Sequence, residues 1–192
     1  MPLLTPFGEA YVCQEPTSLR VNQDNWSYFK DTGRGFSITG PDTNSPLFVV
    51  KTKYMGKHRT FEDRHGEALC HLKRNFLSKS NAWVLTRGDQ TVLNVSSGWG
   101  SWRLRIAIEG LSDGEPSGCD LEIKSPDSWG NCFTVNLAGS TIMKMQCLNN
   151  MNNGNTSSSW DLNVTEGTDL VFAAALAVVI SDSYSEMHMH MA

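Results

Sequence analysis

Short segments with alternating apolar and polar residues recur along the chain between about residues 18 and 164. An alternation with a period of two is typical of β-strands that bury one face. The segments that show it, or that are rich in strand-forming residues, lie at 35–39, 46–51, 58–62, 67–72, 82–86, 91–95, 102–108, 120–124, 131–137, 139–146 and 159–164. Turn-forming residues separate most of them, which predicts about ten strands joined as an antiparallel meander, in a sandwich or a barrel.

Residues 170–180 break this pattern because they contain no polar side chain. A helix that is apolar on all sides is buried in protein or in lipid. Eleven residues in a helix span about 16–17 Å, which is roughly half the hydrocarbon thickness of a bilayer. Four alanines make this helix thin, so we expect it inside a barrel. Thr168 is the predicted N-cap, with Asp169 where the helix dipole favours an anion, and Asp182 marks the expected return to water.

The length of 192 residues fits one domain, which we expect to span residues 1–192 with loose tails at about 1–15 and 187–192. The content of 40% hydrophobic residues excludes a disordered chain. The first residues carry no basic charge, and prolines interrupt their short apolar run, so no export signal is predicted. Five cysteines without a C-x-x-C pair indicate free thiols in a reducing compartment. We therefore expect a monomeric, cytoplasmic protein without a transmembrane segment.

Basic residues are concentrated in one part of the chain. Residues 51–87 carry nine Lys or Arg and three acidic residues, a net charge of +6, whereas the whole chain carries −4. Such asymmetry indicates an anionic partner, and the candidate headgroup-binding residues are Lys51, Lys53, His71, Lys73 and Arg74. Alternation puts the first two on one face and His71 with Lys73 on another. The alternative is that all five are solvated outward positions of a barrel, which is the usual place for charge.

The chain shows no set of residues typical of catalysis. It has no G-x-S-x-G elbow, no phosphate loop, no dinucleotide fingerprint and no pair of carboxyl groups at strand spacing in an apolar pocket. The histidines at 188 and 190 are too few to form a metal site alone. A pI near 5.7 argues against nucleic acid. We expect no enzyme activity, no cofactor and no metal.

Several segments, taken in their order along the chain, resemble the LURP-one-related family. The chain enters its apolar helix through the sequence VTEGTDL at 164–170 and leaves it through ISD at 180–182. Further matching pieces lie at 35–38, 46–51, 63–66, 72–77 and 83–88, so that the resemblance spans about residues 17–186. It implies the tubby C-terminal-like fold that the family shares with phospholipid scramblases. This fold is a closed antiparallel barrel of about 12 strands around a buried C-terminal helix.

The resemblance also implies a function. Plant members are associated with defence, and tubby proteins bind phosphoinositides through a basic motif, which is similar to residues 71–77 here. Lys73 fits that motif, while His71 stands in place of a lysine. We expect a non-enzymatic module, peripheral to membranes, that recognises anionic phospholipid or phosphoinositide headgroups. The alternative is a protein-interaction or structural scaffold, related to defence or stress, that binds no lipid. A carrier of apolar ligands is a third hypothesis, against which the helix in the lumen argues.

Overall fold

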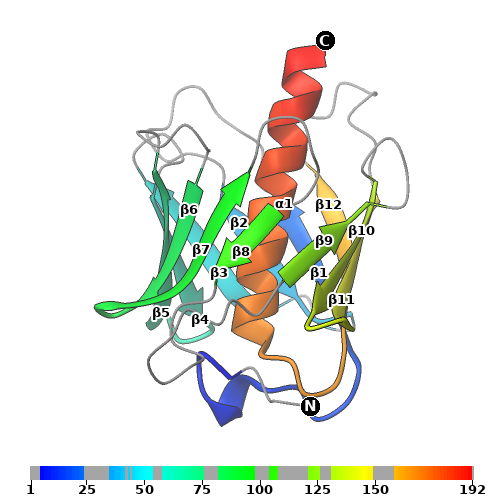
Figure 1. Cartoon of the computed structure of the whole chain (residues 1–192). Helices are drawn as coiled ribbons and strands as arrows, with labels where there is room; N and C mark the ends of the chain where they lie inside the picture. Colours follow the sequence, from blue (N-terminus) through cyan, green and yellow to red (C-terminus); the bar gives the residue numbers. More distant parts are fainter. Residues whose placement is uncertain are drawn as a thin grey trace.

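The computed structural model describes residues 5–23, 35–41, 43, 45–53, 58–75, 82–97, 104–107, 121–125, 131–148 and 158–191. One short 3-10 helix, η1 (Glu9–Tyr11), precedes the sheet, and one long helix, α1 (Leu170–Met191), follows it (Figure 1). The strands are β1 (Thr17–Gln23), β2 (Phe36–Thr39), β3 (Pro46–Lys53), β4 (His58–Asp63), β5 (Ala68–Asn75), β6 (Ala82–Arg87), β7 (Gln90–Ser97), β8 (Leu104–Ala107), β9 (Leu121–Lys124), β10 (Cys132–Leu137), β11 (Ser140–Cys147) and β12 (Ser159–Val164).

The strands encircle α1 in their sequence order. Each pairs antiparallel with its neighbours, and β1 pairs with both β2 and β12, so the strand order returns on itself. The β10–β11 ladder holds six residue pairs, whereas β8 and β9 meet only at Ile106 and Leu121 (front of Figure 1). The predicted antiparallel, mainly β fold around a C-terminal helix is therefore confirmed. The prediction of a closed barrel holds only for the strand order, because one residue pair does not make a hydrogen-bonded ladder at this junction.

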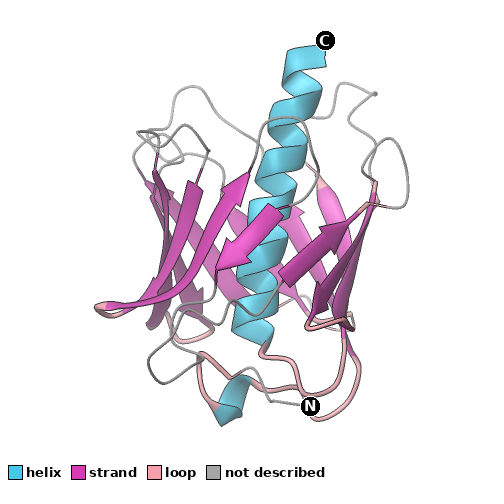
Figure 2. Cartoon of the chain, in the orientation of Figure 1, coloured by secondary structure: helices cyan, strands magenta, loops and turns pink. Residues whose placement is uncertain are grey.

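The core lies between the inner face of the sheet and the helix (Figure 2). On β3, the inner side chains of Phe48, Val50 and Thr52 are buried, while Lys51 and Lys53 between and after them are exposed. Every residue of α1 from 171 to 180 is buried, as expected for a helix without a polar side. This packing explains why the alternating strands and the uniformly apolar helix occur in one chain.

Asp169, rather than the predicted Thr168, is the N-cap of α1. Its Oδ1 accepts hydrogen bonds from the backbone N–H groups of Val171 and Phe172, at 2.9 and 3.1 Å. Its Oδ2 accepts a third bond, of 2.8 Å, from the N–H of Phe7. Thr168 is buried beside it, and its hydroxyl lies 3.2 Å from that of Thr165. A carboxylate has two acceptor oxygens, so Asp169 caps the helix and anchors the N-terminal segment at once.

The expected loose N-terminal tail is wrong for residues 5–15. Phe7 is buried, and the backbone N–H of Cys13 donates to the carbonyl of Thr168 at 3.0 Å. Arg87 donates to the carbonyl of Pro6 at 3.1 Å. These contacts hold the segment against the start of α1, at the lower end of the sheet in Figure 1. At the other end of the chain, residues 187–191 continue the helix.

Polar contacts surround α1 near the upper end of the sheet. Asp182, which the sequence placed in water, is buried and forms an ion pair of 2.5 Å with the buried Arg59 of β4. The Ser181 hydroxyl lies 3.2 Å from that of Ser158. The Tyr184 hydroxyl donates to the side chain of Asn131 at 3.0 Å. The helix is therefore fixed to three parts of the surrounding wall at the level where it leaves the sheet.

Candidate functional site

Strands β3, β4 and β5 bring the basic side chains of the middle of the chain together. Lys51 lies opposite Thr60, which lies opposite His71, in one row across the three strands. In the next row, Lys53 lies opposite His58, and His58 lies opposite Lys73. Residues directly opposite each other on paired strands project from the same face of the sheet. The lysines and histidines of these two rows are here named the basic surface, which consists of Lys51, Lys53, His58, His71 and Lys73.

The basic surface is on the outer face of the sheet. The three lysines are exposed and both histidines are half-buried. Between them in sequence, Thr52, Arg59 and Leu72 are buried on the inner face. Four of the five predicted headgroup-binding residues therefore lie on one surface, although the sequence had assigned them to two faces. The register between strands decides this point, and the residues alone do not reveal it.

Arg74 does not belong to the basic surface. It follows Lys73 directly, and successive side chains of a strand point to opposite faces. Its guanidinium lies over the ring of Trp83, 5.5 Å from the ring centroid. The prediction that Arg74 lines the same surface as Lys73 is therefore wrong. The alternation of side chains along a strand was sufficient to separate Arg74 from Lys73 without the structure.

His58 is the residue of the basic surface that sequence reasoning missed. Its ring centroid lies 5.4 Å from that of His71, and the Thr60 hydroxyl lies 3.3 Å from Nδ1 of His71. Burial lowers the pKa of His58, and the charges of His71, Lys73 and Lys53 lower it further. The lowered pKa thus reflects burial first and the neighbouring positive charges second. The only sequence signal for it was the place of His58 at the start of a strand that follows Lys53.

One carboxylate lies at the edge of the basic surface. Glu62 on β4 forms an ion pair of 2.6 Å with Lys51. Among the described residues, neither Lys53 nor Lys73 forms an ion pair. The charge of Lys51 is thus partly balanced by the protein, whereas those of Lys53 and Lys73 face solvent. This arrangement suits an anion brought from outside.

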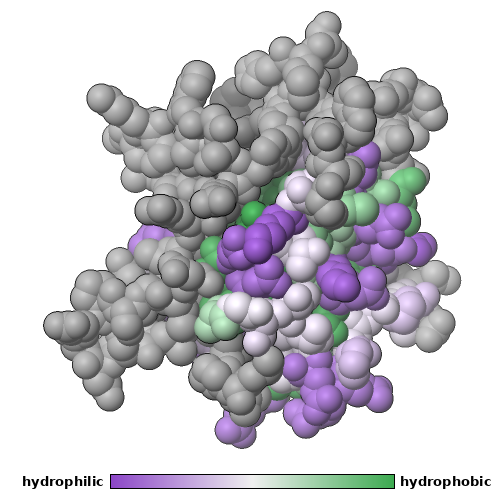
Figure 3. Space-filling model, turned by 45° about the vertical axis from the view of Figure 1, so that its right-hand side comes forward, coloured by the Kyte–Doolittle hydropathy of each residue, from purple (hydrophilic) through white to green (hydrophobic). Residues whose placement is uncertain are grey.

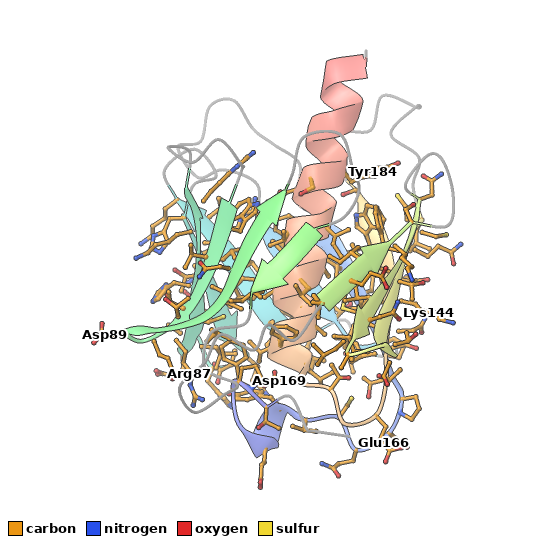
Figure 4. The ribbon with its side chains drawn as sticks, viewed as in Figure 1. Arg87, Asp89, Lys144, Glu166, Asp169 and Tyr184 are labelled. Atoms are coloured by element: carbon orange, nitrogen blue, oxygen red, sulfur yellow. The ribbon has the colours of Figure 1, made fainter. Side chains whose placement is uncertain are left out.

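The buried charged groups serve the fold. Arg59 pairs with Asp182 and lies over the rings of Phe36 and Trp83, with centroid distances of 4.8 and 5.2 Å. Figure 4 shows Asp169 at the start of the helix and Tyr184 nearer its other end. Within the described ranges, no group of three His, Cys, Asp or Glu could hold a metal ion. No helix in the described part of the chain has the length and apolar character needed to cross a membrane.

Outside the basic surface, two exposed ion pairs join opposite charges: Arg20 with Asp161 and Lys124 with Glu122. In the coloured part of the face turned forward in Figure 3, hydrophilic areas lie beside smaller hydrophobic ones. Among the described residues, the one large hydrophobic side chain that is exposed is Leu148, at 42%. The described surface thus offers no broad apolar patch to a partner.

An antiparallel sheet wrapped around one buried, uniformly apolar C-terminal helix defines the class of protein to which this chain belongs. The model of one family, described as LURP-one-related, matches residues 17–182. This range runs from the first residue of β1 to the buried Asp182 of α1. The chain belongs to the LURP-one-related family. No curated protein and no solved structure matches it.

Proposed function

We propose that this protein is a non-enzymatic module that binds anionic phospholipid headgroups at a membrane surface through the basic surface. The observation that supports this most is the register of β3, β4 and β5, which gathers three lysines and two histidines on one outer face. The protein would act in the cytoplasm as a peripheral membrane protein, since the cytoplasmic leaflet carries the negative surface potential. The relation to scramblases and to phosphoinositide-binding tubby proteins is part of the same proposal.

The charges of the basic surface are sufficient for such binding. A basic residue near an anionic membrane contributes about 1 kcal/mol. Lys53 and Lys73 therefore contribute about 2 kcal/mol, which corresponds to roughly a thirtyfold preference for an anionic over a neutral membrane, and Lys51 adds less because it pairs with Glu62. Long lysine side chains also reach the headgroups without bringing the backbone into the bilayer. The binding would be screened by salt, as for any exposed electrostatic contact.

Sedimentation with vesicles tests the proposal. Phosphatidylcholine vesicles with and without phosphatidylserine or a phosphoinositide are compared for the wild type and for Lys53→Glu/Lys73→Glu. The matched control is Lys124→Glu/Lys144→Glu, which makes the same change in net charge at exposed positions of β9 and β11. Strand β11 lies across the molecule from β4 and β5 in Figure 1. We expect the first variant to lose at least tenfold in affinity for anionic vesicles and the control to lose less than threefold.

An equal loss in both variants would show that net charge alone governs the interaction, and the proposed surface would be wrong. The same conclusion follows if the Lys53→Glu/Lys73→Glu protein binds like the wild type. If the wild type binds neither kind of vesicle but retains a single protein partner in a pull-down, the scaffold alternative is favoured.

A further inference from the structure

We propose that His58 and His71 make the basic surface a proton-linked binding site, which holds anionic membranes more tightly as the pH falls below neutrality. This inference rests on the proposed function and adds its regulation. His58 lies between Lys53 and Lys73 in its row, and His71 ends the neighbouring row, two residues before Lys73 on β5. Imidazole is the side chain whose charge ordinarily changes within the physiological pH range.

The geometry disfavours two charged imidazoles while no anion is bound. The ring centroids of His58 and His71 are 5.4 Å apart, so two protonated rings would repel each other at close range. Lys53 and Lys73 lie directly opposite His58 on the two neighbouring strands. The pKa of His58 is accordingly lowered from its ordinary value of 6.5, by burial first and then by these neighbours.

The charged groups around the histidines come from three strands. Strand β3 contributes Lys51 and Lys53, β5 contributes Lys73, and β4 contributes Glu62. On β6, the facing positions are Val84 and Thr86, opposite Lys73 and His71, and neither carries charge. Among these described neighbours, Glu62 is the one acid, and it pairs with Lys51. These described neighbours thus place more positive than negative charge around the two rings.

A phosphate group of a lipid would add negative charge beside the two rings. An anion above the two rows favours the protonated form of both imidazoles, and by linkage each proton taken up strengthens binding of the anion by the same factor. One extra charge near an anionic surface corresponds to about a fivefold gain in affinity. The limit for two histidines is therefore a gain of about twentyfold on acidification from about pH 7.5 to pH 5.5.

Vesicles of phosphatidylcholine with phosphatidylglycerol are the suitable probe, because the phosphodiester keeps one negative charge over this pH range. Binding of the wild type is measured at both pH values and compared with that of His58→Gln/His71→Gln. Glutamine retains hydrogen-bonding groups but takes up no proton. The matched control is His65→Gln, at an exposed position of the turn between β4 and β5. Thermal unfolding of each variant at both pH values verifies that all remain folded.

We expect wild type and His65→Gln to gain between about fivefold and twentyfold in affinity on acidification, and the double variant to gain less than about threefold. An undiminished gain in the double variant overturns the inference, since other groups would then carry the pH response. Equal binding of the wild type at both pH values also overturns it, while the proposed function stands. If the wild type binds anionic vesicles at neither pH, the proposed function itself fails, and this inference fails with it.

Discussion

Replacing Asp169 tests how the helix start and the N-terminal segment are joined. In Asp169→Ala, the backbone N–H groups of Val171 and Phe172 lose their cap, which costs about 0.5–2 kcal/mol. The buried N–H of Phe7 loses the Asp169 carboxylate as its acceptor as well, at a cost of about 1–3 kcal/mol. Burial raises the pKa of Asp169, whereas its hydrogen-bond donors and the charge of Arg87 lower it. The substitution also removes a carboxylate that is unfavourable to bury, which offsets part of the lost stability. The net expectation is a loss of about 2–4 kcal/mol.

Thermal and urea unfolding measure this loss. For a chain of this size, about 2–4 kcal/mol corresponds to a Tm lower by about 5–15 °C. Asp169→Asn retains an acceptor for the cap but presents an NH₂ group to Phe7, and it should lose about 1–2 kcal/mol. Glu166→Ala is the control, because Glu166 is exposed in the same loop (Figure 4), and it should change stability by less than about 0.5 kcal/mol. If Asp169→Ala is as stable as the wild type, the anchoring role of this carboxylate is refuted.

Three further predictions concern charged side chains. Arg59→Met removes the ion pair of the buried Asp182 carboxylate and should cost about 3–5 kcal/mol in urea unfolding, whereas Arg59→Met/Asp182→Leu should recover most of this loss; a double variant no more stable than the single one would contradict the pairing. Arg74→Met should leave vesicle binding unchanged, whereas Lys73→Met should weaken it. Weaker vesicle binding by Arg74→Met would contradict the assignment of Arg74 to the inner face. Without lipid, the free energy of unfolding should fall as the pH drops through 6.5, because the lowered pKa of His58 lets the unfolded chain bind its proton more readily; an identical pH dependence in His58→Gln would contradict this cause.

The regular features of the fold could be predicted from the sequence. Alternation located most strands to within a few residues, and the apolar run at 170–180 predicted a buried helix. Strand β1 was not assigned, because its inner face holds only Leu19, Val21 and the polar Gln23. The N-terminal segment was taken for a tail, because its anchor is a backbone N–H bonded to a residue 162 positions away. Such a contact leaves no periodic signal.

Charged residues were the most difficult to place. Arg59 and Asp182 resemble exposed residues in the sequence and are buried because each neutralises the other. The predicted site contained the three lysines of the basic surface but also Arg74, and it lacked His58. Alternation fixes which residues of one strand share a face, whereas the register between strands fixes which residues of different strands meet. Only the folded chain reveals the register, and with it the second histidine.

The most direct test of the basic surface is lysine acetylation in the presence of anionic vesicles, followed residue by residue with mass spectrometry. The account predicts that bound vesicles protect Lys53 and Lys73 severalfold, while Lys124 and Lys144, exposed on β9 and β11, react at the rate seen with phosphatidylcholine vesicles. Equal protection at all four lysines, or protection confined to Lys124 and Lys144, would contradict the claim that this surface faces the membrane.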